Sequence, residues 1–302
     1  MQLAIIGLGR MGMNMAKRLL QGGHQVVAFN RTPNKTDRLV KEGAIGAYSV
    51  SEVVNRLSHP RVIWIMLPAG SAVDKHINQL KEILSPNDIV IDGGNTYYKD
   101  DIHRNALLAK RGIKFIDTGV SGGIWGLEKG YCLMIGGEIQ TYRYLEPIFK
   151  TLAPEKGYLY CGGVGAGHFV KMVHNGIEYG MMQALAEGLA LLKSREDFDY
   201  DLAALSEAWR HGSVVRSWLL DLTAGFLSND QELQDIAPVV PDSGEGRWTA
   251  IEAIDQGVPA PVMTQAIIAR FESQGGGDYT AKLLASMRNA FGGHAVLPND
   301  ES

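Results

Sequence analysis

A glycine-rich turn at the start of the chain constrains the fold more than any other feature of the sequence. A short apolar run at residues 2–6 leads directly into Gly-Leu-Gly-Arg-Met-Gly at 7–12, helical character follows at 13–20, and a second apolar run lies at 25–29. In this context the glycines permit a tight turn and bring backbone N–H groups at the helix start close to an anion. A turn that merely joins packed elements is the alternative. The context favours a Rossmann-type domain that binds the pyrophosphate of a dinucleotide.

The residues after the second apolar run bear on which dinucleotide is bound. NAD sites usually carry an acidic side chain about 20 residues after the glycines, where it holds the ribose hydroxyls. Here the strand ends in Asn30, Arg31 and Thr32 instead. An arginine can stack on adenine and pair with a 2′-phosphate, and Thr32 and Lys35 can add to that pocket. The sequence favours NADP and leaves NAD open, because an arginine at a strand end is also common without a ligand.

Strand-like and helix-like stretches alternate through the first half of the chain. This alternation predicts a mainly parallel sheet with helices on both faces and ligands at the carboxyl ends of its strands. Glycine-rich loops are expected at that edge at 66–70, 92–95 and 117–123, and the Ser121 hydroxyl followed by two glycine N–H groups would suit a carboxylate. Further strands are expected at 62–66, 89–91, 114–116, 131–135 and 157–161.

The alternation stops after residue 167, and the second half is helical in character. We therefore predict a Rossmann-type doubly wound α/β domain at 1–164 and an all-α domain at 165–302 for substrate binding and oligomerisation. The first helix of the second half would be about 40 Å long, so we expect it to span the domain boundary and anchor an oligomer interface. Helices are expected at about 168–193, 200–210, 217–227, 247–255, 261–273 and 279–290.

The segment at 165–180 carries the strongest indication of chemistry. In a helix, Lys171, His174, Asn175, Glu178 and Tyr179 would share one face. Burying a lysine and a glutamate is costly unless they meet partners or a charged substrate, and desolvation lowers a lysine pKa towards a range useful for proton transfer. A solvated face with an ion pair is the alternative, but such faces favour flexible Lys and Glu. We predict a face that binds a polar ligand.

Composition limits the partners and the compartment. The 302 residues are 45% hydrophobic and 21% charged, and the net charge of -4 argues against nucleic acid or an anionic membrane as the main partner. Cys132 and Cys161 lie in strand-like contexts, and neither a signal peptide nor an apolar span of about 18 residues is present, which predicts a cytoplasmic protein. No metal-ligand spacing occurs, so we predict no metal.

These motifs together resemble those of the 6-phosphogluconate dehydrogenases, within the wider β-hydroxyacid dehydrogenase superfamily. The length resembles that of the short form, which lacks a duplicated helical region. The segment at 171–179 is the most specific, because general β-hydroxyacid dehydrogenases usually have two asparagines in place of His174 and Asn175 and lack the later Glu-Tyr. The matching segments are the glycine turn, 92–95, 120–123, 171–179, 246–249 and 288–294.

The resemblance implies oxidation of 6-phosphogluconate at C3, decarboxylation, and release of ribulose 5-phosphate with reduced NADP or NAD, as in the pentose phosphate pathway. It implies that Lys171 is the general base and then a donor to the keto oxygen, and that Glu178 is the acid that protonates the enediol carbon. The ketone would lie β to the carboxylate, so a protonated lysine can stabilise the developing enolate without a metal. It also implies a homo-oligomer, a dimer or tetramer, in which Arg288 and His294 reach a neighbouring site.

The predicted ligand contacts extend along most of the chain. The cofactor-binding residues are Gly7, Leu8, Gly9, Arg10, Met11, Gly12, Asn30, Arg31, Thr32, Met66, Leu67, Pro68 and Asn95. The substrate-binding residues are Asn95, Ser121, Gly122, Gly123, His174, Asn175, Tyr179, Arg216, Arg247, Thr249, Arg288 and His294.

The chain departs from the family pattern in two places, and two other functions stay open. Arg247 stands where a lysine is common, and Ile124-Trp125 follows the Ser-Gly-Gly where long forms carry acidic residues. One alternative is a dehydrogenase for a small acid such as 3-hydroxyisobutyrate, which has no use for so many cationic groups in the helical half. The other is a non-catalytic dinucleotide sensor, which would not need Lys171 and Glu178 on one face.

Overall fold

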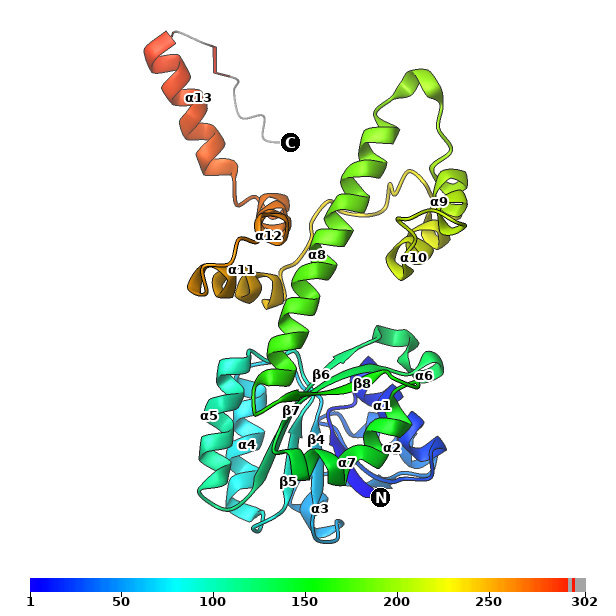
Figure 1. The fold of residues 1–302 in the computed structure, drawn as a ribbon, viewed down its shortest axis with the longest axis vertical. Coiled ribbons are helices and arrows are strands. Elements are labelled where there is room, and N and C mark those ends of the chain that lie inside the picture. The colour runs from blue at the N-terminus through cyan, green and yellow to red at the C-terminus, as the bar shows by residue number, and fades with distance from the viewer. Residues whose placement is uncertain (293–294, 297–302) are drawn as a thin grey trace. The chain divides into compact units, whose positions relative to one another are not determined.

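The structure is a computed structural model that describes residues 1–292 and 295–296. It divides into two compact units, residues 1–174 and 175–302, and the division falls inside one long helix. The alternation of strand-like and helix-like stretches predicted a sheet with helices on both faces followed by helices, and the order of elements confirms this (Figure 1). Among the described residues, no helix is long and apolar enough to cross a membrane.

The first unit is built on an eight-stranded sheet with the order β3-β2-β1-β4-β5-β6-β7-β8. Neighbouring strands are parallel except for β6 and β7, which are antiparallel. The parallel sheet predicted from the alternation is therefore confirmed with one antiparallel pair. The strands are β1 (Gln2–Ile6), β2 (Gln25–Phe29), β3 (Ile45–Gly46), β4 (Val62–Ile65), β5 (Ile89–Asp92), β6 (Lys114–Ser121), β7 (Cys132–Gly137) and β8 (Tyr158–Gly162).

Helices cover both faces of this sheet because side chains alternate along each strand. Leu3 and Ile5 of β1 pack with α1 and α7 on one face, while Ala4 and Ile6 pack with α3, α4 and α5 on the other. The helices of this unit are α1 (Arg10–Gln21), α2 (Pro33–Val40), α3 (Val50–Asn55), α4 (Ser71–Ile83), α5 (Tyr98–Ala109), η1 (Gly123–Trp125), α6 (Gly126–Lys129) and α7 (Ile139–Leu152).

The remaining elements are helical, as the sequence predicts. The 28-residue α8 begins at Ala166, before the division of the units, and continues beyond it. In the second unit a small buried cluster of Tyr179, Ala250, Ala266 and Ile267 forms the apolar centre. The helices are α8 (Ala166–Lys193), η2 (Glu196–Phe198), α9 (Leu202–Arg210), α10 (Trp218–Leu227), α11 (Glu245–Asp255), α12 (Pro261–Ser273) and α13 (Asp278–Gly292).

One boundary near the predicted site was wrong. The sequence places a loop at 117–123, but β6 continues through Asp117 to Ser121. The strand extends because it pairs with β7 in an antiparallel ladder that ends at Ser121 and Cys132. Local glycine content suggested a turn, and strand pairing with a distant segment overrides it. As a result Asp117, Gly119 and Ser121 lie two residues apart along one face of a strand.

Candidate active site

A cleft of about 1220 Å³ lies in the first unit, beside the glycine turn. Eight of the predicted cofactor-binding residues line it, together with Lys35 and three residues of α4 that the sequence did not indicate, Lys75, His76 and Gln79. Arg31 is exposed at its rim. The eight predicted residues that line the cleft are Gly7, Gly9, Asn30, Arg31, Thr32, Met66, Leu67 and Pro68.

The glycine turn is tightly packed at Gly7 and Gly12 and open at Gly9. A Cβ on Gly7 would lie 2.4 Å from the Met66 carbonyl oxygen, and one on Gly12 would lie 2.0 Å from the Gly7 carbonyl oxygen. A Cβ on Gly9 would meet nothing within 4 Å, so the backbone there faces open space at the start of α1. Free N–H groups at a helix start favour an anion, and these residues therefore fit the dinucleotide.

Some predicted cofactor residues lie elsewhere. Leu8 is buried in the core, and its N–H donates to the Asn30 side chain oxygen at 2.9 Å, so Asn30 also supports the turn. Arg10, Met11, Gly12 and Asn95 are not among the residues that line the cleft. Asn95 is exposed in the loop after β5.

The start of α8 contacts β6 at three alternate positions of the strand. The two carboxylate oxygens of Asp117 accept from Gly165 N at 2.7 Å and His168 N at 2.9 Å, which caps the helix. A Cβ on Gly119 would lie 2.3 Å from the Lys171 Cβ, so helix and strand touch there. Farther along, Ser121 Oγ lies 3.5 Å from His174 Nε2. The structure thus brings together three predicted residues of the first unit, Ser121, Lys171 and His174.

Lys171 is held in a largely desolvated position. Its exposed fraction is 6%, although the side chain of a lysine is normally exposed. Cys132 pairs with Ser121 across the ladder, and burial raises the pKa of the Cys132 thiol while the charge of Lys171 partly opposes that shift. Gly122 and Gly123, with φ of 130° and 55°, turn the chain after Ser121. A lysine so placed can exchange a proton with a bound hydroxyl group.

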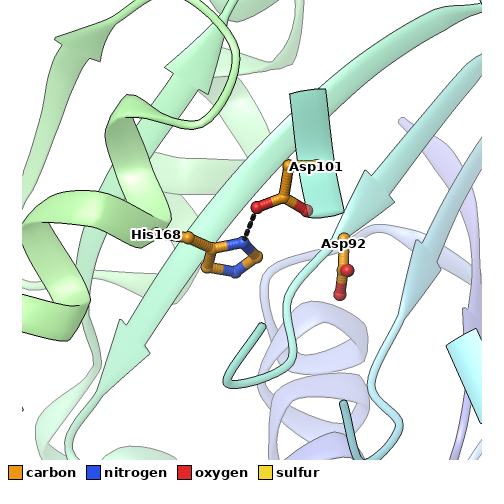
Figure 2. A group of neighbouring side chains, drawn as sticks. All are labelled: Asp92, Asp101 and His168. Atoms are coloured by element: carbon orange, nitrogen blue, oxygen red, sulfur yellow. Dashed lines mark hydrogen bonds and ion pairs between the residues drawn. The ribbon is translucent and has the colours of Figure 1, made fainter. Parts of the chain in front are cut away.

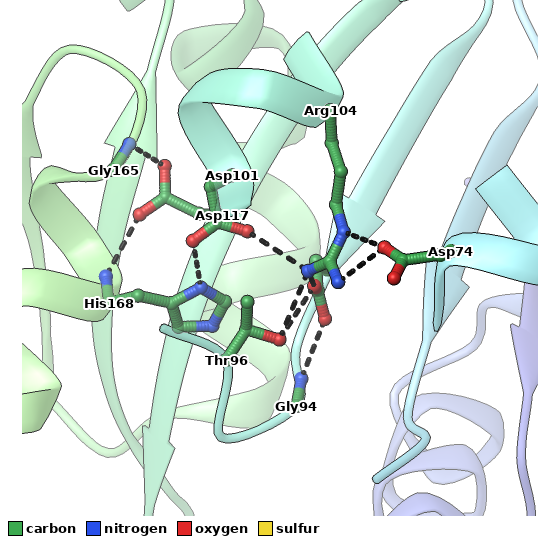
Figure 3. Close-up of polar contacts among 9 residues, drawn as sticks. Asp74, Gly94, Thr96, Asp101, Arg104, Asp117, Gly165 and His168 are labelled. Carbon is green, nitrogen blue, oxygen red and sulfur yellow. Dashed lines mark hydrogen bonds and ion pairs between the residues drawn. The ribbon is translucent and has the colours of Figure 1, made fainter. Parts of the chain in front are cut away.

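Charged side chains from β5, α5 and the first turn of α8 form a buried array (Figure 3). This array was not predicted from the sequence. Arg104 Nη1 donates to Asp92 Oδ2 at 3.0 Å and lies 3.8 Å from Asp101 Oδ1, while Arg104 Nε and Nη2 donate to Asp74. His168 Nδ1 lies 2.6 Å from Asp101 Oδ2. Asp101 and Arg104 are three apart on one helix, but no spacing in the sequence links them to His168.

Burial sets the protonation of this array. Desolvation raises the pKa of Asp101 to about 7, and the neighbouring His168 partly opposes that shift. Desolvation alone would lower the pKa of His168, but the carboxylates of Asp101, Asp92 and Asp117 outweigh it and raise that pKa to about 9. The Asp101–His168 contact is therefore an ion pair at slightly alkaline pH.

Asp92, Asp101 and His168 could in principle hold a metal ion, because one ligand atom of each lies within 4.8 Å of the others (Figure 2). The cation position between the two carboxylates is taken, however, by the Arg104 guanidinium. Arg104 is 2% exposed and cannot turn into solvent without breaking its bonds to Asp92 and Asp74. The arrangement is that of an ion-pair network in which arginine supplies the positive charge.

In the second unit, Tyr179 is packed between a glycine and an arginine. A Cβ on Gly246 would lie 2.5 Å from the Tyr179 ring, and the guanidinium carbon of Arg270 lies 3.4 Å from the ring centroid. The Tyr179 hydroxyl bonds to Ser243 Oγ at 2.9 Å, and burial raises the pKa of this tyrosine. Arg270, which the sequence analysis missed, thus adds a cation beside a predicted phosphate ligand.

The other predicted substrate residues of this unit are dispersed. Thr249 is buried and lies against Gly176, and Asn175 is also buried. Arg247 pairs with Asp242 and lies over the Phe271 ring at 5.4 Å. Arg216 and Arg288 are exposed, Arg216 just before α10 and Arg288 on α13. His294 lies outside the described residues.

The sheet, the glycine turn and the cleft define a protein with a Rossmann-type dinucleotide-binding domain. Residues 2–163 match the NAD binding domain of 6-phosphogluconate dehydrogenase, and residues 167–281 match the 6-phosphogluconate dehydrogenase C-terminal domain. The chain belongs to the 6-phosphogluconate dehydrogenase family.

Individual relatives agree with this membership. The chain is 39% identical, over 100% of both proteins, to the NAD(+)-dependent decarboxylating 6-phosphogluconate dehydrogenase of Haloferax volcanii. It is 41% identical to the NADP(+)-dependent decarboxylating enzyme of Bacillus subtilis, over 90% of this chain and 61% of that protein. The cofactor of the family is a nicotinamide dinucleotide, and these two relatives differ in which one they use.

Solved structures give the same fold. The 6-phosphogluconate dehydrogenase of Plasmodium falciparum aligns with a TM-score of 0.82 at 30% identity, over 100% of this chain and 67% of that one. A 3-hydroxyisobutyrate dehydrogenase of Salmonella typhimurium aligns with a TM-score of 0.77 at 21% identity, over 91% and 95%. The second likeness extends to the fold alone.

Proposed function

We propose that the protein oxidises 6-phosphogluconate at C3 and decarboxylates the product to ribulose 5-phosphate and CO2, with reduction of a nicotinamide dinucleotide. The proposal rests on one observation: Lys171 is buried and packs against Gly119 of β6, in a chain that belongs to this family. A desolvated lysine on a fixed helix is suited to proton exchange with a substrate hydroxyl. The bound nicotinamide supplies the hydride acceptor.

Lys171 has two roles in this proposal. The neutral amine takes the proton of the C3 hydroxyl as the C3 hydride leaves, so the C3 carbon becomes a ketone. The ammonium that results then donates a hydrogen bond to the ketone oxygen while the bond between C1 and C2 breaks and CO2 departs. Because the ketone is β to the carboxylate, the electron pair of the broken bond is accommodated as an enediol.

Glu178 completes the reaction as the acid that protonates the enediol carbon. It lies seven residues beyond Lys171 on the continuous helix α8, a spacing that returns to the same helical face. Asn95, Ser121, Gly122, Gly123, His174 and Asn175 are the proposed ligands of the carboxylate and hydroxyls. Tyr179, Arg216, Arg247 and Thr249 are proposed for the phosphate, with Arg288 and His294 contributed by a neighbouring subunit.

The decisive assay uses purified protein with 6-phosphogluconate and either NADP or NAD, following nicotinamide reduction and CO2 together. We expect one CO2 for each nicotinamide reduced. Lys171→Met should lower kcat by about 1,000-fold or more and leave dinucleotide binding intact. Lys193→Met, which removes an exposed lysine at the far end of the same helix, is the matched control and should keep wild-type kcat. Turnover retained by Lys171→Met would reject the proposed role.

NADP is the proposed preferred cofactor. Arg31, Lys35 and Lys75 line the cleft with positive charge, and Glu82 also lines it. We expect Arg31→Leu to lower the ratio of kcat/KM for NADP to that for NAD by about 10- to 100-fold, the loss of a charge-assisted hydrogen bond. Arg38→Leu, on the same stretch but outside the cleft, should leave the ratio unchanged. An unchanged ratio in Arg31→Leu would reject the assignment.

A homo-oligomer, a cytoplasmic location and a role in the pentose phosphate pathway complete the proposal, with 1–164 as the dinucleotide domain and 165–302 as the substrate and oligomer domain. Large apolar side chains are exposed in the second unit, among them Leu191 at 73%, Ile254 at 76% and Val262 at 67%. We propose that a neighbouring subunit covers these side chains. Light scattering of the purified protein at the mass of one chain would contradict the oligomer.

A further inference from the structure

The buried array of Asp92, Arg104, Asp101 and His168 joins elements that are distant in sequence. Asp92 ends β5, Asp101 and Arg104 lie on α5, and His168 lies on α8. Each of these four side chains is at most 2% exposed. Burying so many charges costs free energy that apolar residues of similar size would not, so stability alone does not account for the array.

One end of the array holds the loop that carries Asn95. Asp92 Oδ1 accepts from Gly94 N at 3.0 Å, and Asp92 Oδ2 accepts from Thr96 Oγ1 at 2.8 Å. These two bonds lie immediately before and after Asn95 in the chain. The position of the Asn95 backbone is therefore set by the Asp92 carboxylate, which Arg104 in turn orients.

The other end of the array holds the helical turn that leads to Lys171. Among the described residues, the His168 ring makes its hydrogen bond through Nδ1 to Asp101, and its Nε2 is buried without a hydrogen-bond partner. The rotation of the first turn of α8 about its axis thus depends on this contact and on the Asp117 cap. Lys171 follows one turn later, in contact with Gly119.

We infer that His168 and Asp101 are positioning residues, and that the array from Asp92 to His168 fixes the distance between the Asn95 loop and Lys171. This inference rests on the proposed function, because Asn95 and Lys171 must face the same bound substrate for that distance to matter. Misplacement of a reacting group by about 1 Å can lower a rate by about 100-fold. Neither positioning residue exchanges a proton with the substrate.

The test uses the full-length protein after turnover of the wild type has been established. The variants are His168→Gln and Asp101→Asn, and the matched control is Asp88→Asn, a buried aspartate with arginine and histidine partners before the other end of β5. We expect kcat to fall by about 10- to 100-fold in both variants, with KM and the NADP dissociation constant within about threefold of wild type. Asp88→Asn should lower stability and keep kcat.

Hydrogen exchange gives a readout independent of catalysis. In both positioning variants we expect faster exchange in 165–174 and in 92–96, whereas Asp88→Asn should leave these segments as in the wild type. If either variant does not fold, Thr96→Val replaces it, because it removes the Thr96–Asp92 hydrogen bond with little change of shape and should lower kcat several-fold.

Three results would overturn the inference. One is wild-type kcat in folded His168→Gln and Asp101→Asn, another is unchanged exchange in both segments, and the third is an equal loss of kcat in Asp88→Asn. A wild type that shows no turnover with either cofactor would instead reject the proposed function. In that case changed exchange would still be expected from the array, so the two failures are distinguishable.

Discussion

Two buried aspartates lie at opposite ends of β5, and their surroundings differ. Asp88, just before the strand, accepts from Ser85 N, Arg61 N, Arg61 Nη1 and His59 Nδ1 at 2.8 to 3.1 Å. His59 and Arg61 are 53% and 17% exposed at the side chain. Asp92, which ends the strand, instead faces Arg104 at 2% exposure, with Asp101 and His168 beyond it.

The difference is the one we expect between a structural contact and the functional one that we propose. At the amino end of β5, every donor to Asp88 comes from a nearby loop. The hydrogen-bonding capacity of this carboxylate is therefore filled, as is usual for a buried polar group that links two strands. At the carboxyl end three carboxylates gather around one arginine, and polar atoms of Asp101 and His168 are left without hydrogen bonds among the described residues. Such local conflict is concentrated where ligands bind at the carboxyl ends of parallel strands.

The largest expected effect on stability comes from removing the arginine at the carboxyl end of β5, compared with removing the one at its amino end. Arg104→Met leaves the buried carboxylates of Asp92 and Asp101 without the guanidinium between them and should lower the free energy of unfolding by about 3–5 kcal/mol. Arg61→Met should cost about 1–2 kcal/mol, because Asp88 keeps three other donors. Urea denaturation of both variants measures this, and equal losses would remove the distinction between the two ends.

The pH dependence of stability should further distinguish the carboxyl end of β5 from its amino end. The folded pKa of His168 is raised from 6.5 to about 9, so its contribution to stability is complete below pH 6.5 and is lost as pH rises through about 9. Desolvation raises the pKa of Asp101 from 3.8 to about 7, which also makes stability fall with rising pH, over a lower range.

Urea denaturation of the wild type and of His168→Gln between pH 7 and pH 9 measures the contribution of His168 to the free energy of unfolding. We expect the difference in unfolding free energy to shrink across this window by an amount on the order of 2–3 kcal/mol. A difference that does not change with pH would show that His168 carries no additional proton in the folded protein. Asp88→Asn serves as the reference for a buried acid at the other end of the strand.

Replacing glycine by alanine at the start of α8 should have a smaller effect on stability. A Cβ on Gly167 would lie 2.5 Å from the Met134 carbonyl oxygen and 2.7 Å from that of Asp117, whereas one on Gly163 would meet nothing within 4 Å. Gly167→Ala should therefore push α8 from the sheet, cost about 1–3 kcal/mol and lower kcat. Gly163→Ala should stay within about 0.5 kcal/mol of wild type. Thermal unfolding with kinetics checks both, and a stable, active Gly167→Ala would show that α8 tolerates displacement.

Much of the fold was predictable because the hydrophobic periodicity of a short segment indicates whether it forms a helix or a strand. The strand at 25–29 and the helix at 261–273 have the predicted bounds, since Gly, Pro and apolar spacing mark their ends. The two-residue strand β3 and the full length of β6 were missed, because a short edge strand has no period and β6 is extended by pairing with β7. Such pairing is not encoded within a local window.

The candidate site was predictable where it depends on one helix or one turn. The glycine turn and the polar face of α8 follow from spacing, and Ser121 and His174 do meet. The array was missed because it joins α5 to α8 through a contact between Asp101 and His168, 67 positions apart in the chain. No spacing within either helix specifies that contact. Arg270 was missed for the same reason, because its partner Tyr179 lies on a different helix.

Metal ions should have the smallest effect, although Asp92, Asp101 and His168 have the donor atoms of a metal site. Arg104 Nη1 lies 3.0 Å from Asp92 and 3.8 Å from Asp101, so a divalent ion would have to displace a guanidinium held also by Asp74. We expect EDTA or added Mn²⁺ to leave the Tm and kcat of the wild type unchanged.

In Arg104→Met the guanidinium between these carboxylates is gone, so Mn²⁺ should raise the Tm of that variant by mass action. Arg61→Met is the control, because Asp88 is a single carboxylate that remains hydrogen-bonded, and its Tm should not respond. A wild type that loses stability in EDTA would show that the carboxyl-end array holds an ion. The array would then be a metal centre, in which Arg104 donates hydrogen bonds to the ligands of the ion.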